Sequence, residues 1–293
     1  MVKTDGSIVC PSSKSNLVGI KPTVGLTSRY LVIPLSEHQD TIGPIARTVK
    51  DAAQILQAIA GIDSSDNYTL AIPNKGKLPD YVAACRLSAL KGARIGIPRN
   101  EISRLTRDPA QVNFELDEFD KALSVLKQAG AIVIDPANFT EMQRIQDAEF
   151  GLVSADFPVN LLAYTSKLTV NPHNITDLAS LRNFTRTFAK EEYPSRDTSL
   201  WDYVLEKKDW NNTNPRFWTA YQEYVQANSE GALLGTLKRE NLNALLMPTS
   251  FSPMWAAGIG TPIVNVPLGF SPSDTPVRMD SRGDLVATAP GIP

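Results

Sequence analysis

The chain has 293 residues, of which 42% are hydrophobic, and a formal net charge of −2 at pH 7. A chain of this length and composition can bury a substantial core, as one large domain or two ordinary ones, so a disordered protein is excluded. Its 29 basic and 31 acidic residues are interspersed. We therefore expect neither a nucleic-acid-binding surface nor a basic membrane-binding patch. The expected partner is a small molecule that is neutral or weakly charged.

The two cysteines, Cys10 and Cys85, are too few for a disulfide framework, and their spacing fits no zinc motif. We interpret both as structural thiols. Cys10 is a poor candidate nucleophile, because a catalytic thiolate needs a cationic partner.

The sequence contains no run of about 18 apolar residues that could span a bilayer, and its first residues lack the apolar core of a signal peptide. We expect a soluble, intracellular chain. Five sequons of the form N-x-T favour the alternative of a secreted or vesicular parent protein. They begin at Asn67, Asn138, Asn174, Asn183 and Asn211. The sequence leaves the oligomeric state open.

In chain order, residues 1–46 are rich in glycine and proline and predict irregular structure with short strands. From Arg47 to Ala60 the apolar residues recur at helical spacing, and Gly61 is a suitable stop. A polar linker is expected over residues 63–80. A short helix is expected near Tyr81–Leu90.

The next segment has the pattern of a parallel crossover. Residues 93–98 form a short β-like run, and an amphipathic helix with Phe119 and Leu123 on its apolar face then ends at Gly130. Residues 131–134 read as a second buried strand. Strand, helix and strand in this order favour a right-handed parallel connection in a sheet covered on both faces, which indicates an α/β fold.

Residues 141–239 are mostly helical in pattern, with breaks near 171–174, 193–194 and 211–215. Most of the aromatic residues here are expected in the core, and a minority could line a cavity. Strand character returns at 244–249 and at 262–267.

The N-terminal residues Thr4–Ser13 contain the most informative motif, in which Ser7 follows Gly6. This segment is too polar for a core strand and too rich in small residues for a helix. It therefore predicts a tight turn that presents backbone N–H groups, and such a turn can hold an oxyanion.

The ordered series formed by Thr4–Ser13, Gly19–Leu26 and Asp40–Asp51, followed by Gly61-Ile62-Asp63, resembles the amidase signature family. The resemblance implies hydrolysis of a carboxamide C–N bond through an acyl-enzyme on Ser7. It implies an oxyanion hole formed by the backbone around Thr4, Asp5, Gly6 and Ser7. The implied partner is a small amide substrate, and no metal or organic cofactor is implied.

The resemblance also implies an α/β fold with a mixed, mainly parallel sheet flanked by helices on both faces. We expect a single domain over residues 1–293, with residues 141–239 as a helical insertion that shapes the substrate cavity.

The sequence departs from the family in one respect. Family members carry a lysine base and a serine in a cis peptide N-terminal to this motif, and no Gly-Gly-Ser-Ser-Gly-Gly loop occurs in the chain. We therefore expect a fragment that lacks both ends of the domain and is inactive by itself. The alternative is a non-catalytic remnant, which either binds a small molecule or is unstable.

Several other residues have two interpretations. Lys14 and Lys21 could replace the missing base, but a structural or surface role is favoured because a base needs an oriented, desolvated amine. Asp40 and Arg47 could form an ion pair that braces the motif, or could mark the start of a helix.

A Ser–His–Asp triad would need His38 or His173, and no serine lies in a Gly-x-Ser-x-Gly elbow. Asp51 and Asp63–Asp66 could be metal ligands, but a solvated helix face and linker explain them better.

Overall fold

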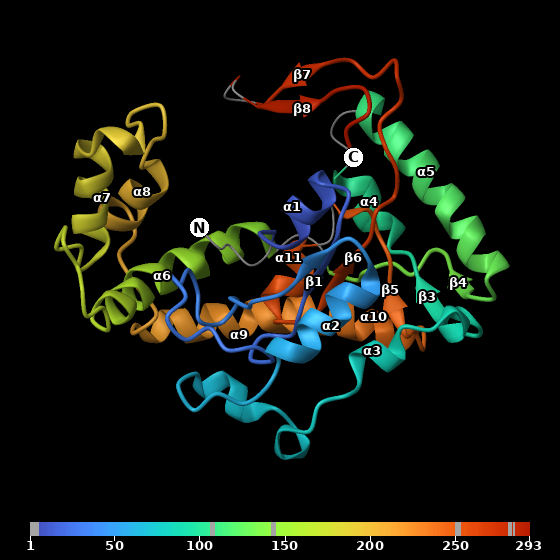
Figure 1. Cartoon of the computed structure of the whole chain (residues 1–293), viewed down its shortest axis with the longest axis horizontal. Coiled ribbons are helices and arrows are strands. Elements are labelled where there is room, and N and C mark those ends of the chain that lie inside the picture. Colours follow the sequence, from blue (N-terminus) through green and yellow to red (C-terminus); the bar gives the residue numbers. More distant parts are fainter. Residues whose placement is uncertain (1–5, 106–108, 142–144, 250–252, 281–282, 284) are drawn as a thin grey trace.

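The computed structural model describes residues 6–105, 109–141, 145–249, 253–280, 283 and 285–293 (Figure 1). Helices and short strands alternate along the chain, as expected for an α/β fold. The helices are α1 (Val9–Lys14), α2 (Val49–Ile59), α3 (Tyr81–Ala84), α4 (Arg99–Leu105), α5 (Pro109–Gln128), α6 (Ile145–Thr165), α7 (Leu178–Thr187), α8 (Ser199–Glu206), α9 (Pro215–Ser229), α10 (Leu233–Arg239) and α11 (Pro253–Gly258). The strands are β1 (Val18–Lys21), β2 (Ile45–Ala46), β3 (Arg94–Gly96), β4 (Ile132–Ile134), β5 (Ala244–Leu245), β6 (Ile263–Asn265), β7 (Arg278–Met279) and β8 (Val286–Thr288).

The described strands form three small sheets, in the orders β2-β1-β6, β4-β3-β5 and β7-β8. The sequence predicted a mainly parallel sheet, but parallel pairing among the described strands is confined to β4-β3-β5. Strand β1 is antiparallel to both of its neighbours. The chain returns from β1 to β2 through a loop, and parallel pairing of two successive strands requires a crossover that this loop does not supply.

The predicted crossover is present, because β3 and β4 are parallel neighbours and α4 and α5 lie between them in sequence. Ile95 and Ile97 pack against Phe119 and Leu123 of α5 in one core cluster. However, β4 is not the buried strand that was expected, since Ile132 is 46% exposed. The reason is its place at the edge of the sheet.

The N-terminal segment differs from its prediction, because helix α1 forms where no helix was expected. Its small residues allow close packing instead of preventing helix formation. The Ser12 hydroxyl bonds back to the carbonyls of Ile8 (2.8 Å) and Val9 (2.9 Å). Pro11 lies in the first turn, where a helix loses no hydrogen bond to proline.

Helix α2 confirms the helix predicted from Arg47 to Ala60, with Thr48 accepting a hydrogen bond from the Asp51 amide as its N-cap. Its Ala52 and Leu56 pack against β1. The single helix expected near Tyr81–Leu90 is instead the short α3 and a separate 3₁₀ turn. Within the described ranges, 3₁₀ segments with both ends defined are Asn67–Ala71, Asn74–Gly76, Leu87–Leu90 and Ala189–Glu191.

The predicted helical region over residues 141–239 contains α6 to α10. Helices α6 and α9 run side by side along the molecule, and α7 and α8 lie at one end (Figure 1). Leu152 of α6, Phe217 and Tyr224 of α9, and Trp255 of α11 share a buried core. The interpretation of this region as an insertion that shapes a substrate cavity stays a prediction.

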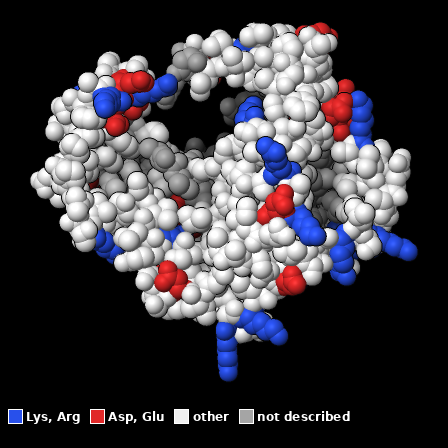
Figure 2. Space-filling view, viewed as in Figure 1, with Lys and Arg blue, Asp and Glu red and all other residues white. Residues whose placement is uncertain are grey.

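The face drawn in Figure 2 carries charged residues of both signs in small, scattered groups. It is hollowed between the α7–α8 pair and the β7–β8 hairpin. None of the helices in the described ranges has the length and apolar character needed to cross a bilayer.

Gly43→Ala should strongly destabilise the fold. A Cβ at Gly43 would lie 1.9 Å from the Ile20 carbonyl oxygen and 2.7 Å from Pro22 Cδ, and the backbone of β1 cannot move aside cheaply. We expect a loss of about 3 kcal/mol or more in the free energy of unfolding, at the upper end for overpacked sites. Chemical denaturation of the purified variant measures this loss.

The matched control is Gly151→Ala in α6, where the nearest atom to the added Cβ is Lys208 Nζ at 4.0 Å. Alanine there should stabilise the protein by roughly 0.5–1 kcal/mol, because it is a better helix former than glycine. Equal stability of the two variants would refute the close packing at Gly43.

Candidate functional site

Ser7 lies in a turn over Gly6–Ile8 that leads directly into α1, and it is partly buried. The Gly6 carbonyl accepts a hydrogen bond from the Cys10 amide at 2.6 Å, which closes this turn. A tight turn was predicted here. Thr4 and Asp5, the other expected contributors to an oxyanion hole, lie outside the described residues.

The turn is held in place by a buried hydrogen-bond network beneath α1. Asn265 of β6 donates through Nδ2 to Ser12 Oγ (3.1 Å) and to the Leu17 carbonyl (3.1 Å). Its Oδ1 accepts a hydrogen bond from the Thr249 hydroxyl at 2.5 Å. Sequence analysis missed Ser12 and Asn265 as supports, because their pairing joins residues 253 positions apart.

Close backbone contact completes the packing of α1 on β1. A Cβ at Gly19 would lie 2.3 Å from Ser12 Oγ, so only glycine fits there. Ile8, next to Ser7, is buried and approaches Gly43, where an added Cβ would lie 3.0 Å from Ile8 Cδ1. The turn that carries Ser7 therefore rests on β1, β6 and the segment before β2.

Lys21, at the end of β1, is fully buried. Its Nζ donates to the carbonyls of Thr261 (2.7 Å) and Pro22 (3.3 Å). Burial lowers the pKa of this amine from 10.5 to about 8. The two carbonyls fix Lys21 as a tie between β1 and the segment before β6, which supports its structural interpretation over the role of a base. Lys14 is exposed.

The expected ion pair between Asp40 and Arg47 does not form among the described residues. Asp40 Oδ2 instead accepts hydrogen bonds from the amides of Leu35 (2.7 Å) and Ser36 (3.0 Å), while Arg47 is exposed. Asp40 therefore closes a local turn, and its buried carboxylate is satisfied by nearby backbone donors. This corrects the bracing role that the sequence suggested for the pair.

A different ion pair braces the loop over residues 29–42. Arg29 binds Asp66 through two nitrogens, at 2.9 Å and 2.8 Å, and its Nη1 donates to the Glu37 carbonyl at 2.5 Å. These hydrogen bonds from Arg29 lower the pKa of Asp66. Asp63 accepts hydrogen bonds from Ser28 and Ser65. Asp63 and Asp66 thus organise the loop, and their contacts do not require the metal-ligand interpretation.

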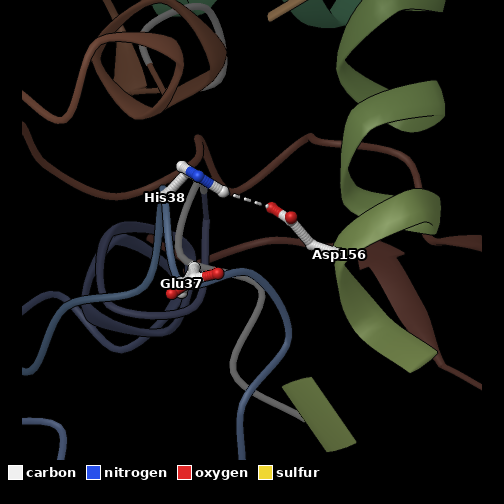
Figure 3. A group of neighbouring side chains, drawn as sticks. All are labelled: Glu37, His38 and Asp156. Carbon is white, nitrogen blue, oxygen red and sulfur yellow. Dashed lines mark hydrogen bonds and ion pairs between the residues drawn. The ribbon is translucent and has the colours of Figure 1, made fainter. Parts of the chain in front are cut away.

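Asp156 of α6 ties the same loop to the helical region (Figure 3). This carboxylate is 1% exposed; its Oδ2 accepts from His38 Nδ1 at 2.8 Å and from the Ser36 hydroxyl, and its Oδ1 accepts from Asn212 at 3.0 Å. The His38 ring also packs against Phe217, Trp218 and Tyr221 of α9. The loop is therefore anchored to both α6 and α9.

This cluster does not have the geometry of a Ser–His–Asp triad. The hydroxyl of Ser36 and the ring of His38 both donate to Asp156 Oδ2, so the hydroxyl proton points to the carboxylate and not to the imidazole. A triad requires the serine to bond to the histidine. The other histidine, His173, packs against Phe184 with ring centroids 4.8 Å apart.

Glu37, His38 and Asp156 each place one possible metal-ligand atom within 4.8 Å of the others. However, both oxygens of Asp156 already accept hydrogen bonds, and Figure 3 shows no bond from Glu37 to either neighbour. These hydrogen bonds explain the cluster as a buried link between the loop and α6, because a buried carboxylate is stable when its oxygens accept hydrogen bonds.

These contacts define the class of protein: an α/β fold that presents a Gly-Ser turn on an antiparallel sheet, with long helices beside it. A family model described as Amidase matches residues 3–284 of the chain. The chain therefore belongs to the amidase family, which confirms the resemblance seen in its motifs.

Individual relatives agree with this assignment. A protein of Arthroderma benhamiae that carries an amidase name is 52% identical, over 99% of this chain and 48% of its own length. A protein of Schizosaccharomyces pombe, also with an amidase name, is 36% identical over 94% of this chain and 51% of its own length.

Among solved structures, a peptide amidase from Stenotrophomonas maltophilia matches with a TM-score of 0.78 and 30% identity. The match covers 92% of this chain and 55% of that one, and it confirms the α/β fold class. The chain spans about half the length of the relatives that it matches.

The lowered pKa of Lys21 predicts a pH-dependent stability. Between about pH 8 and the ordinary lysine value of 10.5, the unfolded chain binds a proton that the folded chain has released, so the free energy of unfolding rises with pH. A shift of this size contributes about 3 kcal/mol over that interval. Below pH 8 this contribution is absent.

Lys21→Met removes the titrating group while keeping an unbranched side chain. Urea denaturation of both proteins from pH 7 to pH 11 should show that the original chain gains about 3 kcal/mol relative to the variant. Parallel pH profiles would show that the lysine titrates as it does in the unfolded chain.

Asp156→Ala should destabilise the protein by about 2–4 kcal/mol, because it leaves the donors of Ser36, His38 and Asn212 buried without their acceptor. The control is Asp120→Ala, which removes a carboxylate that is 54% exposed and pairs with Arg99. That loss should stay within about 1 kcal/mol. Similar losses of unfolding free energy in both variants would show that the hydrogen bonds to Asp156 do not stabilise the protein.

Proposed function

We propose that this chain carries the nucleophile segment of an amide hydrolase, with Ser7 as the attacking group and a carboxamide as the substrate. The observation that supports this most directly is the position of Ser7. It lies in the closed turn between Gly6 and α1, supported from below by β1 and β6, in a chain of the amidase family.

In the proposed reaction the Ser7 hydroxyl oxygen attacks the amide carbonyl carbon and loses its proton to a base. The carbonyl becomes an oxyanion, which backbone N–H groups of the turn would stabilise, those of Gly6 and Ser7 together with Thr4 and Asp5. The C–N bond then breaks, and the amine leaves with a proton. Water hydrolyses the resulting ester on Ser7 to a carboxylate.

The proposal assigns the base and the proton relay to residues outside these 293. The sequence has no Gly-Gly-Ser-Ser-Gly-Gly loop, and the buried Lys21 is bonded to two carbonyls. A serine hydroxyl without a positioned base is a weak nucleophile. We therefore expect the chain by itself to turn over amides very slowly or not at all. The second candidate is a non-catalytic small-molecule binder, which is favoured by a pocket of about 180 Å³ between the loop over residues 29–42 and α6.

A fluorophosphonate probe tests whether Ser7 is poised to react. We expect slow labelling of the folded chain, seen as a mass increase on the peptide that contains Ser7, and no such adduct in Ser7→Ala. The matched control is Ser13→Ala, a partly buried serine of the neighbouring helix, which should label like the original chain.

Two results would count against the assignment of Ser7 as the nucleophile. Labelling that persists in Ser7→Ala would place the reactive group elsewhere. A folded, soluble chain that shows no adduct would favour the non-catalytic binder.

A further inference from the structure

The five N-x-T sequons of the chain differ in the exposure and the contacts of their residues. A sequon that accepts an N-linked glycan lies in a surface loop. Both of its defining side chains must be reachable, the asparagine that receives the sugar on Nδ2 and the threonine that completes the acceptor. A glycan attached before folding also needs an exposed asparagine, because the folded chain has no room for so bulky a group in its interior.

The sequon at Asn174 meets these conditions. It lies in the loop between α6 and α7, and both Asn174 and Thr176 are exposed. Thr176 is bonded through its backbone only, since its amide donates to Ser180 Oγ at 2.9 Å and its carbonyl accepts from Thr165 at 2.6 Å. Within the described ranges, neither sequon side chain forms a hydrogen bond of its own. Both therefore face solvent.

The loop keeps its shape without help from the Asn174 side chain. Asn171 donates through Nδ2 to the Ile175 carbonyl at 2.8 Å and accepts from the Ile175 amide at 3.0 Å. Its own carbonyl accepts from the Asn174 amide at 3.1 Å. Asn174 has a φ of 50°, in the left-handed region that asparagine tolerates better than most residues. The ring of His173 packs on Phe184 of α7.

Two of the other sequons have a buried threonine. Thr69, in the sequon at Asn67, is 0% exposed, and its hydroxyl donates to the Asp63 carbonyl at 2.9 Å. Thr185, in the sequon at Asn183, is 6% exposed. This second sequon also lies inside α7 and not in a loop. Neither has the geometry of a surface acceptor loop.

The two remaining sequons have a threonine hydroxyl that is already bonded. Thr140, in the sequon at Asn138, donates to the Gly231 carbonyl at 3.0 Å. Thr213, in the sequon at Asn211, donates to Asn211 Oδ1 at 2.7 Å. Asn211 is also partly buried. Both sequons are therefore poorer acceptors than an exposed pair of side chains with no partner in the protein.

We propose that Asn174 is the main N-glycosylation acceptor of this chain. Among the five sequons, all of which lie in the described part of the chain, it alone combines a loop, an exposed asparagine and an exposed, unbonded threonine. The co-reactant is a lipid-linked oligosaccharide diphosphate. A bond forms between Asn174 Nδ2 and the anomeric carbon of the first sugar, the bond from that carbon to the diphosphate oxygen breaks, and Nδ2 gives up one proton as the lipid diphosphate leaves.

This inference goes beyond the proposed function, because it requires no reaction at Ser7. Helix α7, which follows the loop of Asn174, lies at one end of the molecule, away from α1 (Figure 1). A glycan at this end would leave the turn of Ser7 uncovered. Glycosylation and the reaction at Ser7 can therefore be tested separately.

Translation of the chain with a cleavable secretion leader, in a cell-free system that contains microsomes, tests the acceptor. Protease treatment removes every chain that has not been translocated, so only the chain inside the microsomes is analysed. We expect a glycan on the peptide that contains Asn174, at a higher occupancy than on the peptides of the other four sequons. Peptide N-glycosidase should release it from the folded chain without denaturant, because the loop is exposed, and should leave an aspartate in place of Asn174.

Three variants separate the acceptor from the fold. Asn174→Gln and Thr176→Val should each abolish the modification at this loop, whereas Thr176→Ser should retain it because the hydroxyl is kept. The melting temperatures of the unglycosylated proteins should match that of the original chain, since both side chains face solvent. The matched control is Asn183→Gln, on an exposed position of α7, which should leave the modification at Asn174 unchanged.

A translocated, protease-protected chain whose Asn174 peptide carries no glycan would overturn the site. Higher occupancy at any of the other four sequons would overturn Asn174 as the main acceptor. A glycan at Asn174 that is released only after denaturation would contradict the exposed loop on which the proposal rests.

Discussion

The contact on which the rest of this structure depends is the close approach of α1 to β1. Ser12 occupies the space that a side chain at Gly19 would need, and the Ile20 carbonyl occupies the space beside Gly43. Such contacts hold only while these positions lack a Cβ, since protein interiors have little free volume. They fix the turn of Ser7 against the sheet more rigidly than its few hydrogen bonds could do alone.

A second set of constraints comes from buried carboxylates that serve the loop over residues 29–42. Asp40 closes a turn inside it, Asp66 holds Arg29, and Asp156 binds its serine and histidine from α6. Each carboxylate meets more than one donor, which offsets the cost of its burial. The loop is therefore a fixed wall between the antiparallel sheet and the long helices, although it contains no regular secondary structure.

Local sequence patterns predicted the elements that depend on local chemistry. Helix α2 follows from its apolar spacing and its threonine cap, and the β3–β4 pair follows from the strand, helix and strand order. Tertiary contacts decided the rest. Helix α1 depends on its close packing against β1. The partner of Asp40 is its own backbone and not Arg47, and the link from His38 to Asp156 spans 118 positions that no sequence spacing reveals.

The pocket and the turn of Ser7 share one support, although different residues form them. Thr41 lines the pocket, and Gly43, two positions later, packs against Ile20 and approaches Ile8, the neighbour of Ser7. The Thr27 hydroxyl fixes the intervening residue by donating to the Ile42 carbonyl at 2.8 Å. Because Thr27 holds the Ile42 carbonyl and Gly43 packs closely on Ile20, residues 41–43 connect the pocket wall to the contact at Ile8. The pocket wall and the turn of Ser7 therefore depend on the same short segment, residues 41–43.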